Sequence, residues 1–192
     1  MNIQEIVLRL AGWVGEYVDR WEGDLRSELG RMGLVVGLAR ENVVRGTGGP
    51  FGAGVFEMGG GRLAAVGVNM VEAARCSVAH AEVVALSLAQ QGLGEYDLSE
   101  AGDYELVCST APCAMCLGAV IWSGVRRVVC GARGADAEAV GFDEGSKPAD
   151  WAGALEGRGI EVVQDVMRAE AREVLQEYVE GGGVIYNPRR GR

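Results

Sequence analysis

Two cysteines in the segment APCAMCLGAVIW, residues 111–122, constrain this chain more than any other feature. Cys113 and Cys116 lie three residues apart, directly after Pro112. This spacing is compatible with a redox-active dithiol, a structural zinc clip, or part of a catalytic metal site. The chain contains five cysteines and a single histidine, so few further metal ligands of these types are available. Other parts of the sequence are needed to distinguish these three kinds of site.

Composition predicts a globular cytoplasmic protein. The 192 residues are 48% hydrophobic and 23% charged, which suits a single folded domain. No apolar run approaches the ~20 residues of a membrane-spanning helix, and the acidic N-terminal segment does not resemble a signal peptide. Thiols stay reduced in the cytoplasm, so metal binding is favoured over a disulfide. The net charge of −9 favours a small-molecule substrate over a nucleic acid, although a local basic groove would still allow RNA.

Hydrophobic periodicity predicts an α/β fold. Two amphipathic helices are expected first, over residues 3–21 and 24–45, the second with Asp24 as its N-cap. A β-hairpin that turns at Gly59–Gly61 follows. Further strands are predicted at 104–110, 126–132 and 159–165, and further helices at 79–92, 113–124, 135–142 and 165–181. Five strands separated by helices predict one sheet covered by helices.

The single histidine lies in AHAE, close to an acid. His80 precedes Glu82 by two residues and Cys113 by 33. Both this segment and CAMC begin predicted helices, and the positive end of a helix dipole stabilises a thiolate, the form that binds zinc. Cys113 and Cys116 share one helical turn, so both sulfurs can reach one ion. One histidine and two cysteines are typical of a catalytic zinc, which keeps one position open.

The other three cysteines offer at most one further ligand. Cys76 is the one candidate for a fourth ligand, because it precedes His80 by four residues. Cys108 and Cys130 lie in apolar strand patterns and are interpreted as small core residues. A thioredoxin-like dithiol would leave Glu82 without a role. The joint pattern H-A-E and P-C-A-M-C is the signature of zinc-dependent base deaminases.

The chain resembles the cytidine and nucleobase deaminase superfamily over residues 25–180, and within it most resembles the bacterial guanine deaminases. The resemblance is carried by GGPFGA (48–53), GVNMV (67–71), AHAE (79–82), APCAMCLGAVIW (111–122) and DAEAVGFDE (136–144). The first four segments also resemble tRNA adenosine deaminases and fungal-type cytosine deaminases. GFDE (141–144), at the end of the fifth segment, distinguishes the guanine deaminases from these two groups. The resemblance implies a three-layer α/β/α fold with a mixed five-stranded sheet. Residues 24–192 would form the deaminase domain, and residues 1–23 an extra N-terminal helix whose role is open.

The activity implied is the hydrolytic removal of a ring amine, with guanine converted to xanthine and ammonia. His80, Cys113 and Cys116 would bind Zn²⁺, which lowers the pKa of its bound water from ~15.7 toward ~7. Glu82 would take a proton from that water and then protonate the ring nitrogen and the leaving amine. Glu144 would bind the guanine edge and relay a second proton.

The resemblance also implies contacts to the substrate and to a second subunit. The base would be contacted by Asn69, Phe51, Trp122, His80 and Tyr186. Asn69 would hydrogen-bond the base, Phe51 and Trp122 would flank it, and Tyr186 is a candidate for a C-terminal aromatic that closes the pocket. A homodimer is implied, in which the C-terminal segments can be exchanged between subunits.

Several other functions stay open at this stage. Deamination of adenosine in tRNA is the main alternative, and the acidic charge counts against it. Cytosine, guanosine or an aminotriazine would also be compatible, because the shape of the pocket sets the choice of substrate. A zinc-stabilised module without enzymatic activity is a further alternative, but it would have no use for Glu82.

Overall fold

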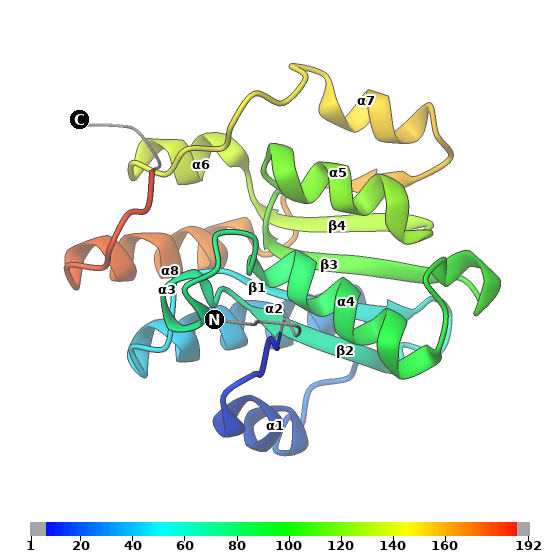
Figure 1. Cartoon of the computed structure of the whole chain (residues 1–192), viewed down its shortest axis with the longest axis horizontal. Helices are drawn as coiled ribbons and strands as arrows, with labels where there is room; N and C mark the ends of the chain where they lie inside the picture. The colour runs from blue at the N-terminus through cyan, green and yellow to red at the C-terminus, as the bar shows by residue number, and fades with distance from the viewer. Residues whose placement is uncertain (1–6, 188–192) are drawn as a thin grey trace, which may run out of the picture.

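A five-stranded sheet forms the centre of the computed structural model, which describes residues 7–187 (Figure 1). The strand order is β2-β1-β3-β4-β5. β1 (Gly52–Glu57) pairs antiparallel with β2 (Leu63–Val68) and with β3 (Tyr104–Thr110). β3, β4 (Arg127–Ala132) and β5 (Glu161–Val163) pair in parallel. The mixed five-stranded sheet is therefore confirmed.

Helices cover both faces of this sheet. They are α1 (Gly12–Asp19), α2 (Glu28–Val44), α3 (Val71–Ala74), α4 (Ala81–Leu93), α5 (Ala114–Ser123), α6 (Gly134–Ala139), α7 (Trp151–Glu156) and α8 (Arg168–Glu180), with a 3-10 turn at Leu98–Glu100. In Figure 1, α4 and α5 lie in front of the sheet and α2 lies behind it. This arrangement confirms the three-layer fold.

Alternating side chains of the central strands build one apolar core on each face. In β3, Val107 packs in the core that contains α2 and α8, whereas Leu106 and Cys108 pack in the core that contains α4 and α5. Cys130 of β4 lies in the same core as Cys108. Both cysteines are buried, as expected of small core residues. Because both faces are covered, these strands have nearly continuous apolar sequences.

The first helix is shorter than predicted. Residues 3–6 lie outside the described part of the chain, and residues 7–11 are not helical, so α1 begins only at Gly12. Leu8 and Leu10 pack against the α2 core from this non-helical segment. Tertiary packing thus satisfies the apolar pattern that had suggested a helix, and a short helix gains little stability by itself.

Two other helix boundaries also differ from the predictions. The N-cap of α2 is Ser27, whose Oγ accepts from the N–H of Gly30 (3.0 Å), and Asp24 instead closes a preceding turn. α4 continues through Gly92 and ends before Gly94, which has a left-handed φ of 75°. The short helix α7 was not predicted. Its N-cap is Asp150, whose side chain accepts from the N–H of Gly153.

α1 is joined to the segment that follows α2. The indole Nε1 of Trp13 donates to Oγ1 of Thr47 (3.2 Å), and the guanidinium of Arg45 lies 5.3 Å from the Trp13 ring centroid. Val14 is buried against the core. The division into residues 1–23 and 24–192 stays a prediction.

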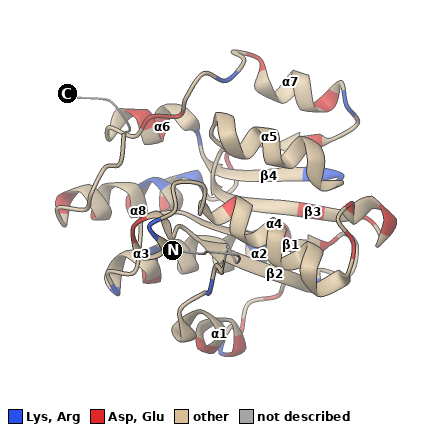
Figure 2. Ribbon diagram, in the orientation of Figure 1, with Lys and Arg blue, Asp and Glu red and all other residues tan. Residues whose placement is uncertain are grey.

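Basic side chains are dispersed over the fold. In Figure 2 they lie on separate elements, among them α8 and the start of β4. Several are paired with acids, for example Arg168 with Asp136 (2.8 Å) and Arg127 with Glu105 (2.8 Å). Such pairing offsets their charge locally. None of the helices in residues 7–187 is both long and apolar enough to cross a bilayer.

Candidate active site

His80, Cys113 and Cys116 converge at one edge of the sheet. Their ligand atoms all lie within 4.8 Å of one another. Each cysteine Sγ lies 3.6 Å from Nδ1 of His80. Zinc bonds of about 2.3 Å to sulfur and about 2.0 Å to nitrogen, at a tetrahedral angle, would separate these atoms by about 3.5 Å. The three residues therefore fit a tetrahedral Zn²⁺ ion.

Two helix N-termini create this convergence. His80 is the N-cap of α4 and Cys113 the N-cap of α5, and Cys116 lies in the first turn of α5. A hydrogen bond from Cys116 lowers the pKa of the Cys113 thiol to about 4, whereas the same bond and burial raise the pKa of Cys116. The two sulfurs thus share one proton, which a divalent cation would displace.

Cys76 does not contribute a fourth ligand. Within residues 7–187, the histidine, cysteine and acidic groups that could hold an ion together are the three named above. Cys76 is partly buried and packs against the α2 core, and its carbonyl accepts from the N–H of Ala79 (3.0 Å). A tetrahedral ion would keep one position for water, as in catalytic zinc sites.

A cavity of about 70 Å³ opens beside the three ligands. One water needs about 10–15 Å³ on this measure, so the space exceeds that of a single water. The predicted residues that line it are Phe51, Asn69, His80, Glu82, Cys113, Glu144 and Tyr186. Most of the predicted site is thus brought together in one place.

Glu82 is buried beside the ligands. It lies in the first turn of α4, and only 8% of its surface is exposed. Burial, and then the negative charge of Cys113, raise the pKa of its carboxyl. A carboxyl with a raised pKa can take and return a proton near neutral pH, which is the property a general acid–base needs.

The side chain of Asn69 is oriented by the backbone. Its Oδ1 accepts from the N–H groups of Gly49 (3.4 Å) and Val71 (3.3 Å). Its Nδ2 has no hydrogen-bond partner among the described residues, and the residue lines the cavity. Asn69 therefore presents a donor to a ligand.

Asn42 supports this orientation and was not predicted. It is fully buried, and its Nδ2 donates to the carbonyls of Gly49 and Asn69 (both 2.9 Å). Its Oδ1 accepts from the hydroxyl of Thr47 (2.7 Å), which in turn accepts from Trp13. The N-terminal helix is thereby linked to the cavity. The available signal was a polar residue within the apolar stripe of residues 24–45.

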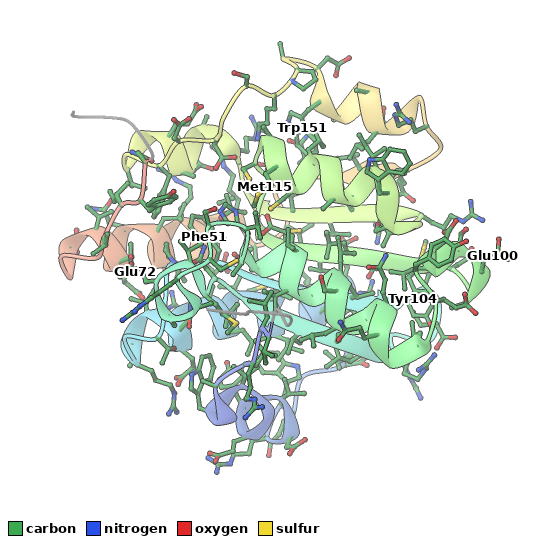
Figure 3. The ribbon with its side chains drawn as sticks, in the orientation of Figure 1. Phe51, Glu72, Glu100, Tyr104, Met115 and Trp151 are labelled. Carbon is green, nitrogen blue, oxygen red and sulfur yellow. The ribbon has the colours of Figure 1, made fainter. Side chains whose placement is uncertain are left out.

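An aromatic wall closes one side of the cavity. Phe51 meets Phe142 edge to face, with ring centroids 4.9 Å apart, and Phe142 stacks on Tyr178 at 6.0 Å. Figure 3 labels Phe51, which precedes β1, in this part of the molecule. Phe142 and Tyr178 were not predicted, although Phe142 is part of the GFDE segment.

Trp122 is a correction to the predicted site. It does not line the cavity, and 83% of its surface is exposed. It follows Cys113 by nine residues along α5, which is about 13 Å at 1.5 Å per residue. The prediction was that Trp122 flanks the base, and the structure does not place it at the cavity of this chain. Phe142 and Tyr178 line the cavity instead.

Glu144 lies in the cavity on the loop between α6 and α7. It is 6% exposed, and its main-chain carbonyl accepts from the N–H of Ala114 (2.9 Å) in the first turn of α5. Burial raises the pKa of its carboxyl to about 7, although the nearby Lys147 acts in the opposite direction.

The C-terminal segment returns to this loop within the same chain. Oδ1 of Asn187 accepts from the N–H of Asp143 (2.9 Å), and its Nδ2 donates to the carbonyl of Gly141 (2.7 Å). Tyr186, immediately before it, lines the cavity and is 47% exposed. The position of Tyr186 agrees with a pocket-closing aromatic. Exchange of this segment between subunits stays a prediction.

Known proteins share both the sequence and the fold. The family model of the cytidine and deoxycytidylate deaminase zinc-binding region matches residues 29–132. Guanine deaminase of Bacillus subtilis is 42% identical over 109 residues, which are 57% of this chain and 67% of that protein. The solved guanine deaminase from Nitrosomonas europaea has a TM-score of 0.86 at 47% identity, over 93% of this chain and 97% of its own.

A solved mutant protein in complex with 8-azaguanine has a TM-score of 0.85 at 47% identity, over 91% of this chain and 97% of its own. The family match spans more than half of the chain. It includes His80, Glu82, Cys113 and Cys116, which form the site described above. The chain therefore belongs to the family defined by the cytidine and deoxycytidylate deaminase zinc-binding region.

Proposed function

We propose that this protein is a zinc-dependent guanine deaminase, which converts guanine and water to xanthine and ammonia. The observation that carries the proposal is the position of Glu144, the acid of GFDE, in the cavity beside the zinc ligands. Two similar proteins are guanine deaminases, and a similar mutant protein was solved in complex with 8-azaguanine. These similarities support the choice of base.

The chemistry follows from the ligands and from Glu82. His80, Cys113 and Cys116 would hold a Zn²⁺ ion, which would supply Lewis-acid activation of a water. Glu82, buried next to the ligands, accepts a proton as that water adds to the ring carbon that bears the amine. It then passes this proton to the ring nitrogen, and it transfers a second proton, from the hydroxyl now bound to the ring carbon, to the departing amine. One water is consumed and one ammonia is released.

Recognition of guanine requires both a donor and an acceptor. Nδ2 of Asn69 provides the donor for a carbonyl or ring nitrogen of the base. Guanine also carries an amine next to a ring N–H, and the carboxylate of Glu144 provides an acceptor for this edge. Phe51 and Phe142 supply apolar surface for the ring. Adenine and cytosine present different edges to these groups.

A substrate panel tests this function. We expect ammonia release to be fastest with guanine among guanine, guanosine, cytosine, adenine and a tRNA anticodon stem. Glu144→Ala should lower kcat/KM for guanine by about 10- to 100-fold, the value of a charge-assisted hydrogen bond, while zinc is retained. Glu138→Ala, an exposed acid on α6, is the matched control. Preference for cytosine or adenine, or full guanine turnover in Glu144→Ala, would contradict the proposal.

We also propose a homodimer located in the cytoplasm. Met115 and Trp122 are exposed apolar residues seven positions apart on α5, so they share one face of that helix. Covering this face with a second copy would bury both side chains. Light scattering should give twice the 20.2 kDa chain mass, and Trp122→Asp should shift it toward the monomer. A monomeric wild-type protein would rule the dimer out.

The reduced thiols required for zinc binding support the proposed location in the cytoplasm, which cell fractionation checks.

A further inference from the structure

Lys147 stands out because it is the only lysine in the sequence. The other basic residues among the 18 are arginines. Lysine side chains are almost always exposed, but that of Lys147 is only 14% exposed. It follows Glu144 by three residues on the α6–α7 loop.

The ammonium of Lys147 contacts an acid that lines the cavity, a carbonyl next to a zinc ligand, and an aromatic ring of α7. Nζ lies 3.2 Å from Oε2 of Glu144 and donates to the carbonyl of Pro112 (3.1 Å). It also lies 5.4 Å from the ring centroid of Trp151, which begins α7 (Figure 3). The ammonium is thus surrounded by a carbonyl, a carboxylate and an aromatic face, all of which favour a positive charge.

These contacts tie two functional loops together on either side of Cys113. Pro112 directly precedes that ligand, and its carbonyl binds Lys147. Ala114 directly follows the ligand, and its N–H donates to the carbonyl of Glu144 (2.9 Å). The loop that carries Glu144 is thus fastened to the zinc-ligand loop at two points.

The ion pair with Lys147 gives the two carboxylate oxygens of Glu144 different surroundings. Oε2 is held by Lys147, whereas Oε1 has no hydrogen-bond partner among the described residues. Because Glu144 lines the cavity, Oε1 is the oxygen left for a ligand.

The ion pair of Lys147 and Glu144 packs against Gly134, which has no side chain. A Cβ at this position would lie 2.7 Å from Nζ of Lys147 and 3.2 Å from Oε2 of Glu144. The backbone of Gly134, at the start of α6, does not have a positive φ, so any need for glycine there is steric. The tight fit also suits a compact ammonium better than a planar guanidinium.

We propose that Lys147 is a positioning residue, which holds Oε2 of Glu144 so that Oε1 faces the amino-amide edge of the base. The inference rests on the proposed guanine deaminase function. Lys147 does not contact the substrate in this arrangement. It acts through Glu144 alone. Replacing Lys147 should therefore lower kcat/KM for guanine only slightly once Glu144 has been replaced by an uncharged residue.

A double-mutant cycle tests the proposal. Lys147→Met keeps the length of the side chain and removes its charge. It should lower kcat/KM for guanine by about 10- to 100-fold, the range for a lost charge-assisted hydrogen bond. In a Glu144→Gln background the same substitution should lower kcat/KM by less than about threefold, because the effects of substituting two interacting residues are not additive. Zinc content should be unchanged in all four proteins, and Arg62→Met, an exposed charge of the β-hairpin, is the control.

Gly134→Ala provides a second route if Lys147→Met does not fold. Alanine is a better helix former than glycine, so any loss of guanine activity without a loss of thermal stability would come from displacement of the pair. We expect a smaller loss than in Lys147→Met, and no added loss in Glu144→Gln. Equal losses with and without Glu144, or wild-type activity of both variants, would overturn the proposal. Absence of guanine turnover in the wild-type protein would instead refute the function itself.

Discussion

Replacing Glu82 with glutamine should remove most of the turnover while leaving zinc in place. Glutamine keeps the size of the side chain but cannot accept the proton of the attacking water. Loss of a general acid–base lowers rates by ~10²–10⁴. Because Glu82 lies beside the ligands and is not one of them, metal content should stay at the wild-type level. Steady-state rates with guanine and metal analysis of the same preparation give both quantities.

The control for this experiment is Glu95→Gln, an exposed acid just after α4. It makes the same chemical change outside the cavity and should leave both turnover and zinc unchanged. Near-normal turnover of Glu82→Gln would show that another group transfers the protons. Loss of zinc from that variant would show that Glu82 also contributes to metal binding. Its assignment to proton transfer alone would then be wrong.

Replacing Cys113 with alanine should remove the metal and, with it, the activity. The geometry supports three protein ligands, so each contributes a large share of the affinity for zinc. Wild-type protein should contain about one zinc per chain, because a single group of ligands has been found within residues 7–187. Cys113→Ala should contain far less, with deamination near the uncatalysed rate. Elemental analysis and ammonia release are the measurements.

Cys76→Ala is the matched control, since Cys76 packs against the α2 core and is not a ligand. It should retain wild-type zinc and activity. A decrease in zinc content in this variant would restore Cys76 as a ligand. Full activity of a metal-free protein would refute the mechanism altogether.

Sequence by itself determined the two halves of the metal centre and the class of fold. His80 with Glu82, and Cys113 with Cys116, each lie within one helical turn, so covalent spacing nearly fixes their relative positions. The apolar runs of β3 and β4 likewise predict buried strands, because strand periodicity is a local property. Local rules are sufficient wherever the interacting residues are close in sequence.

Only the tertiary structure decided which residues surround the base. Phe142 and Tyr178 are 36 residues apart in sequence but stack together, and Asn42 reaches Asn69 across 27 residues. Trp122 belongs to the same quoted segment as Cys113, yet the length of α5 carries it out of the cavity. Lys147 needed the structure as well, because its partner Pro112 lies 35 residues away in sequence. The pocket forms where several loops meet, and no periodic pattern along the chain records how folded segments pack against each other.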